Sequence, residues 1–266
     1  MLRKIALHLG LILSCLLVIL PPLWALRTSL VPEPMAYSAD LFPGWSWENY
    51  QGLLEKNNFL VHYRNSLIVS ICSVILAMPF AAATGYAFAR FRTGGRAARF
   101  IMLATQMLPA VALVLPAFAL LRTLGLTNSL VGLTLVYAAL NLPFLTWILM
   151  GFFEGIPVDL EWAAMTDGAT AWGAFRHVVL PVSLPGLAAA AVLGFILSWN
   201  EFLFALVLSG PQTSTIPVAL AALQTSNGVQ IGKVSAGVVM AILPLIIASH
   251  FIQRFIVKGL TFGSVK

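Results

Sequence analysis

Charged residues are scarce in this chain, and their absence is concentrated in long stretches. Only 9% of the 266 residues are Asp, Glu, Lys or Arg, while 60% are hydrophobic and the mean hydropathy is +0.94. This balance excludes an ordinary water-soluble globular protein. Long apolar stretches contain no charged residue between Lys4 and Arg27, Arg64 and Arg90, Arg99 and Arg122, Arg122 and Glu154, Arg176 and Glu201, and Lys233 and Arg254. Each is long enough for the roughly 20 residues that a helix needs to cross about 30 Å of hydrocarbon.

Cysteine is rare in this sequence, and the common catalytic motifs are absent from it. The two cysteines, Cys15 and Cys72, fall inside apolar intervals, so neither a disulfide framework nor a metal cluster is indicated. The chain has no Walker motif, Gly-rich phosphate loop, paired metal-ligand histidines or Gly-x-Ser-x-Gly elbow. No internal or inverted repeat is evident, and nothing beside the net charge of +6 suggests nucleic-acid binding. The sequence therefore predicts no chemistry performed by this chain itself.

The apolar intervals predict an all-α membrane protein, because lipid cannot satisfy the backbone groups of open strands. The period-2 alternation of a membrane β-barrel does not occur. We expect a single transmembrane domain, residues 1–266, with six membrane-spanning helices over 5–27, 65–89, 100–121, 129–153, 183–208 and 235–256. Prolines within or beside these spans predict kinks: Pro79, Pro109, Pro116, Pro143 and Pro244.

The amino terminus has two interpretations. Arg3 and Lys4 before an apolar run resemble a signal peptide, and the letters ILSC that end at Cys15 faintly resemble a lipoprotein cleavage box. The apolar run continues to Leu26 without a small-residue cleavage site, which favours a retained first span.

Basic residues predict the orientation in the membrane. With both termini in the cytoplasm, ten basic residues lie inside: Arg3, Lys4, Arg90, Arg92, Arg96, Arg99, Arg176, Arg254, Lys258 and Lys266. Five lie outside: Arg27, Lys56, Arg64, Arg122 and Lys233. This bias follows the positive-inside rule and predicts a multi-pass membrane protein in contact with anionic lipid.

Two longer connections then lie outside, residues 28–63 and 209–234. The first contains Trp45, Trp47 and Tyr50, which suit a short helix at the headgroups. The second is polar at both ends with an apolar centre, so that a re-entrant or surface helix is possible there.

One cytoplasmic segment, residues 154–181, differs from the rest of the chain in its small and acidic residues. Pro157 suits the first position of a short helix, Asp159 and Glu161 put negative charge in its first turn, and Gly168 ends it. Thr170 is expected to cap a second helix from about residue 171 to residue 180, before prolines break the path into the fifth span. Composition alone leaves two interpretations of the first helix: a knob for the groove of a partner protein, or an amphipathic helix on the inner leaflet.

The spacing of this segment resembles the EAA loop of ABC importer permeases. The pattern Ala163-Ala164, three residues, Gly168, nine residues, Val178, one residue, Leu180-Pro181 is similar to the family's Glu-Ala-Ala, x3, Gly, x9, Ile, x, Leu-Pro. Four other stretches resemble the carbohydrate branch, which includes the smaller permease subunit of maltose importers. They are Asn65-Ser66, GYAFARF at 85–91, SWNEF at 198–202 and GLTFGSVK at 259–266.

The resemblance implies the type I ABC importer permease fold in the bacterial inner membrane, with a short cytoplasmic coupling helix between spans four and five. It also implies partners: a second homologous permease, two ABC ATPase subunits that bind ATP and Mg²⁺, a periplasmic substrate-binding protein, and a small sugar or polyol as solute. No cofactor is expected in this chain. The residues implied in ATPase coupling are Leu160, Glu161, Trp162, Ala163, Ala164, Met165, Asp167 and Gly168.

The motif departs from the family at one position, where Trp162 stands in place of the glutamate. In the family this acid helps to hold the loop in a cleft of the ATPase, and the nearest carboxylate here is Glu161. A tryptophan can fill a cleft with apolar area. We therefore expect Trp162 to be buried against the ATPase or against the loop's own second helix.

Polar residues within spans are candidates for the solute pathway, because lipid disfavours them. They are Asn65, Gln106, Asn141, Trp199, Asn200 and Glu201. An amide and an aromatic face suit a sugar, but each of these residues could equally bond across helices as packing. For Glu201 an ion pair or hydrogen bond between helices is the alternative, with Arg122 as a possible partner.

In the connection 209–234, Gln212, Thr213, Gln224 and Asn227 are candidates for contact with the binding protein. A passive surface turn is the alternative there.

Two other classes of protein remain open at this point. An ion-coupled secondary transporter or channel would place several acids in its spans, whereas Glu201 is the only one. An intramembrane enzyme needs a nucleophile and a base brought together, and no motif does so.

Overall fold

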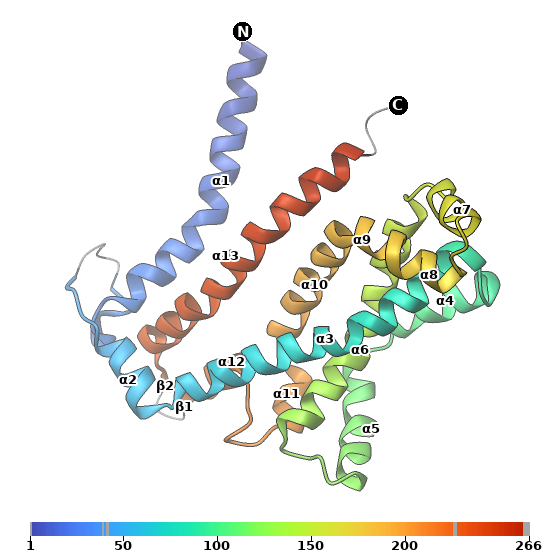
Figure 1. Ribbon diagram of the computed structural model, residues 1–266. Helices are drawn as coiled ribbons and strands as arrows, with labels where there is room; N and C mark the ends of the chain where they lie inside the picture. Colours follow the sequence, from blue (N-terminus) through green and yellow to red (C-terminus); the bar gives the residue numbers. More distant parts are fainter. Residues whose placement is uncertain (1, 39, 41–42, 226–227, 263–266) are drawn as a thin grey trace. The chain divides into compact units, whose positions relative to one another are not determined.

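The structure is a computed structural model that describes residues 2–38, 40, 43–225 and 228–262, and it is mostly helical (Figure 1). The longer helices are α1 (Leu2–Ser29), α3 (Phe59–Phe91), α4 (Gly95–Gln106), α5 (Ala110–Thr123), α6 (Leu130–Glu154), α10 (Leu184–Trp199) and α13 (Ile231–Phe262). The shorter ones are η1 (Glu33–Met35), α2 (Glu48–Lys56), α7 (Asp159–Thr166), α8 (Ala171–Ala174), the π-turn η2 (Phe175–Val179), α9 (Leu180–Val182), α11 (Leu203–Leu208) and α12 (Ile216–Ala221). Strands β1 (Gln224–Thr225) and β2 (Gly228–Val229) form one small antiparallel pair in this otherwise helical chain.

Four helices are each long and apolar enough to cross a membrane: Leu7–Ser29, Phe59–Phe91, Leu130–Glu154 and Ile231–Phe251. Two bent pairs of helices raise the number to six if each pair counts as one span. The prolines Pro79, Pro116, Pro143 and Pro244 lie inside helices that continue through them. The expected spans one, two, four and six therefore correspond to single helices.

The expected third span is not one straight helix. Helices α4 and α5 meet at a bend of 90° between Gln106 and Ala110. Pro109 has no N–H to donate, and its extended backbone (ψ 128°) precedes the first residue of α5. The proline thus separates two helices rather than kinking one.

The expected fifth span, 183–208, is also corrected. It begins with a bend of 73° between Ala171–Val182 and Leu184–Trp199, where the prolines were expected to interrupt the path. It then breaks a second time, because α10 ends at Trp199 and α11 begins only at Leu203. Glu201, between them, accepts hydrogen bonds from the N–H groups of Phe204 and Ala205. A side-chain acceptor for the first free amides stabilises the start of a new helix, as an N-cap residue does.

By contact density the chain divides into two compact units, residues 64–215 with 245–266, and residues 1–63 with 216–244. In the first unit α3, α6 and α10 pack against one another around a buried apolar core. Gly85 of α3 lies so close to α6 that a Cβ there would meet the Thr146 carbonyl oxygen at 3.0 Å. A Cβ on Gly194 of α10 would similarly lie 3.1 Å from side-chain atoms of Leu145 and of Val74. Small residues let these helix backbones approach closely.

In the second unit, a few polar side chains fix the segment that follows α1. Asn49 of α2 donates to the carbonyl groups of Ser29 and Val31, at 3.1 and 2.7 Å. The carboxylate of Glu33 accepts from the backbone N–H of Gly232 and Lys233, at the start of α13. Along α1 itself the leucines are mostly exposed, as lipid contact requires.

Candidate coupling site

The short helix α7 lies in the segment 154–181, between α6 and the helices that lead into α10. It spans Asp159–Thr166, with Asp159 and Glu161 in its first turn, where the helix dipole favours negative charge. Its carboxyl end is closed by hydrogen bonds from the N–H groups of Asp167 and Gly168 to the carbonyls of Ala163 and Met165. Gly168 has φ +93°, a conformation that favours glycine, and the chain reverses there.

The second half of the segment is less regular than expected. The hydroxyl of Thr170 accepts from the N–H of Gly173 at 3.1 Å, which confirms the predicted cap. The expected second helix is present without a break from Ala171 to Val182, but it contains the π-turn η2 between α8 and α9. Single π-turns of this kind occur inside α-helices and replace the i→i+4 bonds locally by i→i+5 bonds.

Most of the predicted coupling residues present their side chains at the surface of the chain. Leu160, Trp162, Ala163, Met165, Asp167 and Gly168 are exposed, and Ala164 is half-buried. Trp162 is 60% exposed, so it is not buried against the loop's second helix. Its burial against an ATPase remains a prediction. Trp172 of α8, which the sequence analysis did not single out, is exposed as well.

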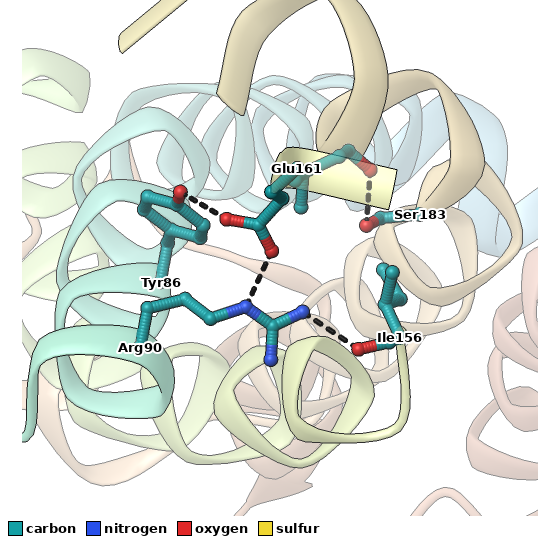
Figure 2. A network of polar contacts seen from close by, with 6 residues as sticks. Tyr86, Arg90, Ile156, Glu161 and Ser183 are labelled. Carbon is teal, nitrogen blue, oxygen red and sulfur yellow. Dashed lines mark hydrogen bonds and ion pairs between the residues drawn. The ribbon is translucent and has the colours of Figure 1, made fainter. Parts of the chain in front are cut away.

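Glu161 is the exception among these residues, because its side chain turns inward and is only 5% exposed (Figure 2). One carboxylate oxygen, Oε1, accepts from Nε of Arg90 at 2.5 Å. The other, Oε2, accepts from the hydroxyl of Tyr86 at 2.5 Å. Both donors belong to the last turns of α3, far away in the sequence. The carboxylate of Glu161 is therefore occupied within the chain, and the part of this residue in ATPase coupling stays a prediction.

The same guanidinium holds a third segment. Nη2 of Arg90 donates at 2.8 Å to the carbonyl of Ile156, in the turn between α6 and α7 (Figure 2). Arg90 is itself only 9% exposed in its side chain. Removing one partner of such a buried pair typically costs about 3–5 kcal/mol, since it leaves the other charge unpaired.

Aromatic rings surround this network. The ring of Tyr86 lies 4.4 Å from that of Phe175 and 5.9 Å from that of Phe153, measured between centroids. Phe153 and Phe175 are almost fully buried. The end of α3, the end of α6, α7 and η2 thus meet around Tyr86 and Glu161, within one compact unit.

The sequence analysis missed Tyr86 and Arg90. It used Arg90 only as a cytoplasmic charge and the GYAFARF stretch only for resemblance. The available signal was the spacing of the two residues, since positions i and i+4 lie on one face of a helix. The sequence does not show which carboxylate lies opposite that face, because this depends on tertiary packing.

Of the candidate pathway residues, Asn141 and Glu201 both take part in hydrogen bonds that join α6 to the region where α10 ends. Asn65 is buried and donates to the carbonyls of Gln212 and Ser214, at 2.9 and 3.1 Å. Asn141 is buried and donates to the Ser198 hydroxyl at 2.7 Å. Trp199 is only 3% exposed. For Asn65 and Asn141 the structure thus provides the packing role that the sequence left open.

The other three pathway candidates differ from one another. Gln106 is exposed at the end of α4 and donates to the Leu140 carbonyl at 3.3 Å, and Asn200 is exposed and bonded to its own helix. Glu201 accepts from the Tyr137 hydroxyl at 2.9 Å in addition to the amides of α11. In the part of the chain that the structure describes, no ion pair joins Glu201 to Arg122.

In the connection 209–234, Gln212 and Gln224 are exposed, while the hydroxyl of Thr213 accepts from the N–H of Gly210 within a turn. Asn227 lies outside the described residues. Among the described residues no three His, Cys, Asp or Glu side chains are grouped so that they could hold a metal ion.

Comparison with known proteins assigns the family. Residues 76–262 match the family described as binding-protein-dependent transport system inner membrane component. The chain belongs to this family. The family expected from the EAA-like spacing is therefore confirmed, and the protein is a multi-pass inner-membrane transport component rather than an enzyme.

Several relatives match over nearly the full length. The trehalose transport permease SugB of Mycobacterium tuberculosis is 36% identical over 93% of this chain and 92% of its own. The trehalose/maltose transport permease MalG of Thermococcus litoralis is 32% identical over 100% of this chain and 98% of its own. A chain of a bacterial ABC transporter that imports the polysaccharide alginate has the same fold, with a TM-score of 0.77 and 25% identity over 95% of this chain and 96% of that one.

Proposed function

We propose that this permease is one half of the membrane pathway of an ABC importer, and that its solute is a carbohydrate or a polyol. The family supports the importer, and the names of the relatives, which include trehalose and maltose permeases, support the solute class. The observation that carries the proposal is α7, a short helix that presents apolar and small side chains from the loop after α6 in a protein of this family.

The surface of α7 suits a groove in a soluble partner. Leu160, Trp162 and Met165 expose apolar area, and Ala163 allows close approach to the helix backbone. Exposed apolar side chains of this size in a loop are typical of an interaction surface. We take the partner to be an ABC ATPase, of which two copies bind ATP and Mg²⁺ and move α7 as they close.

The rest of the assembly follows from the same proposal. A second permease completes the pathway, and a periplasmic binding protein delivers the solute on the side of residues 28–63 and 209–234. Both termini lie in the cytoplasm. Movement of α7 rocks the membrane helices between inward-open and outward-open states by rigid-body rotation. This chain transmits the movement and hydrolyses nothing.

Purification of the tagged chain from its own host in mild detergent tests this assembly. We expect an ATPase to co-purify and the reconstituted complex to take up radiolabelled trehalose, maltose or sorbitol only when ATP and the binding protein are present. In Ala163→Trp the bulky side chain should exclude the partner, so that little ATPase co-purifies. Ala97→Trp, at an exposed position of α4, is the matched control and should retain it. Uptake by this chain without companion subunits, or equal ATPase recovery from both variants, would contradict the proposal.

A further inference from the structure

Helix α7 is bonded to a membrane helix that is distant in the sequence, in addition to its two connections along the chain. Along the chain, α7 is joined to α6 by residues 155–158 and to α8 by residues 167–170, and both joints contain glycine, Gly155 and Gly168. Short joints of this kind do not by themselves fix the direction of an eight-residue helix, and α7 otherwise packs on α8 and η2 of the same loop. A contact with a membrane helix outside the loop is therefore needed if α7 is to move the bundle.

Glu161 supplies that attachment through two bonds to a helix distant in the sequence. Tyr86 and Arg90 are four residues apart, hence one turn apart on the same face of α3, and each donates to a different oxygen of the carboxylate (Figure 2). Two bonds along one turn fix the direction of α7 as well as its distance from α3. The bond from Arg90 to the Ile156 carbonyl ties the preceding turn to the same point.

The network is buried, so water does not compete for these bonds. The side chains of Arg90 and Glu161 are 9% and 5% exposed, and Phe153 and Phe175 pack on the ring of Tyr86. Bonds to charged groups in such surroundings are strong and directional. A force on α7 would therefore displace the end of α3 before it separated the two helices.

We propose that Tyr86, Arg90 and Glu161 form a clasp that transmits the movement of α7 to α3. From α3 the movement reaches α6 and α10, because Gly85 and Gly194 bring these three helices into close contact. The three residues are positioning residues, which touch neither solute nor nucleotide. This inference rests on the proposed function, because it takes α7 to be the element that the ATPase moves.

The test compares Glu161→Gln and Tyr86→Phe in the importer purified with its partner subunits and reconstituted in liposomes. Tyr86→Phe keeps the ring packing and the ion pair but removes one of the two bonds to Glu161. The measured quantity is sugar taken up per ATP hydrolysed, with whichever of radiolabelled trehalose, maltose and sorbitol the wild-type complex carries. We expect the ratio to fall roughly fivefold or more in Glu161→Gln, the lower end of coupling between linked sites, and less in Tyr86→Phe. ATP hydrolysis itself should persist.

A second measurement does not depend on the solute. Amide hydrogen exchange of α7 and of the last turns of α3 is followed in the complex with and without ATP. We expect ATP to change exchange in both segments of the wild type, only in α7 of Glu161→Gln, and in α7 with a weakened change in α3 of Tyr86→Phe. Glu154→Gln is the matched control, because Glu154 also pairs with an arginine, Arg99, at 3.4 Å, but in an exposed position. It should behave like the wild type.

Three results would contradict the inference, and they show whether the inference alone or the proposed function as well is wrong. If both variants keep the wild-type ratio and the wild-type response of α3, the clasp transmits nothing and the inference is wrong. If assembly, ATP hydrolysis and uptake fall together with an unchanged ratio, the network is only structural and the inference is again wrong. If the wild type itself shows no ATP-dependent change in α7, the proposed function fails and the inference fails with it.

Discussion

Glu201 shows how one side chain can interrupt a membrane helix. It stands between α10 and α11, where its carboxylate accepts from the N–H groups of Phe204 and Ala205 and from the Tyr137 hydroxyl of α6. An ion pair or a hydrogen bond between helices was expected from the sequence, and the structure contains the hydrogen bond. A helix start at the same carboxylate was not expected, because the polar residues of SWNEF have apolar segments on both sides.

Glu201→Ala should destabilise the protein. The substitution removes the cap of α11 and the bond to Tyr137, and loss of a cap costs about 1–2 kcal/mol. The apparent melting temperature in detergent, followed by intrinsic fluorescence, should fall by about 2–8 °C for a chain of this size. Asn200→Ala is the control, since Asn200 is exposed and bonds only to its own helix. Equal melting temperatures of the two variants would mean that Glu201 does not hold the break together.

Glu161 and Trp162 are neighbours in the sequence, but their side chains lie in different surroundings. The motif position of the family's acid is occupied by Trp162, which is exposed, while the adjacent Glu161 is buried on α3. On a helix, residues one apart point about 100° away from each other, so only one of the two can face the bundle. The sequence alone does not show which of the two residues faces the bundle.

Among the elements, the contact of α3 with α6 decides the geometry of the coupling site. Gly85 precedes Tyr86, and its Cα faces the backbone of α6. Tyr86 can reach Glu161 because α3 lies this close to α6 and to the loop that follows it. Hydropathy predicted both helices, but the distance between them depends on which small residues face each other.

Gly85→Leu should therefore separate α3 from α6. A Cβ at this position would meet the Thr146 carbonyl at 3.0 Å and the Met150 N–H nitrogen at 3.1 Å, and overpacking typically costs about 1–3 kcal/mol. We expect a lower melting temperature and less monodisperse protein on size-exclusion chromatography. Gly151→Leu on α6 is the control, because no atom lies within 4 Å of a Cβ there. If Gly85→Leu proves as stable as this control, the close approach is not required.

For the molecule as a whole, the orientation in the membrane remains a prediction from charge. The ten-to-five distribution of basic residues places both termini and α7 in the cytoplasm. The docking of α7 to an ATPase depends on that orientation, because ATP is available only on that side.

Fusion reporters test the orientation. Green fluorescent protein fused after Lys266 should fluoresce, because it folds in the cytoplasm. Alkaline phosphatase fused after Gly125 should be active, because the α5–α6 connection is expected outside. The same phosphatase fused after Arg96, in the expected inner loop, is the control and should be inactive. The reverse pattern would place α7 on the wrong side and would remove the basis of the proposed coupling.

The amino-acid pattern alone was sufficient for the class of protein, the approximate membrane segments and the family. Long apolar runs cross lipid whatever surrounds them, and the EAA-like spacing is local, so both can be read without knowing the fold. The cap at Thr170 was predicted for the same reason, since a cap involves residues only three apart.

Only the tertiary structure determined which partners the polar side chains bind. The partners of Glu161, Asn65 and Asn141 are respectively 71, 147 and 57 residues distant in the sequence. The breaks at Pro109 and Glu201 likewise depend on whether neighbouring groups satisfy the freed backbone or replace it with a new helix start. Such contacts arise only when helices pack, because a polar side chain in an apolar segment bonds to whichever donor or acceptor the fold brings within reach.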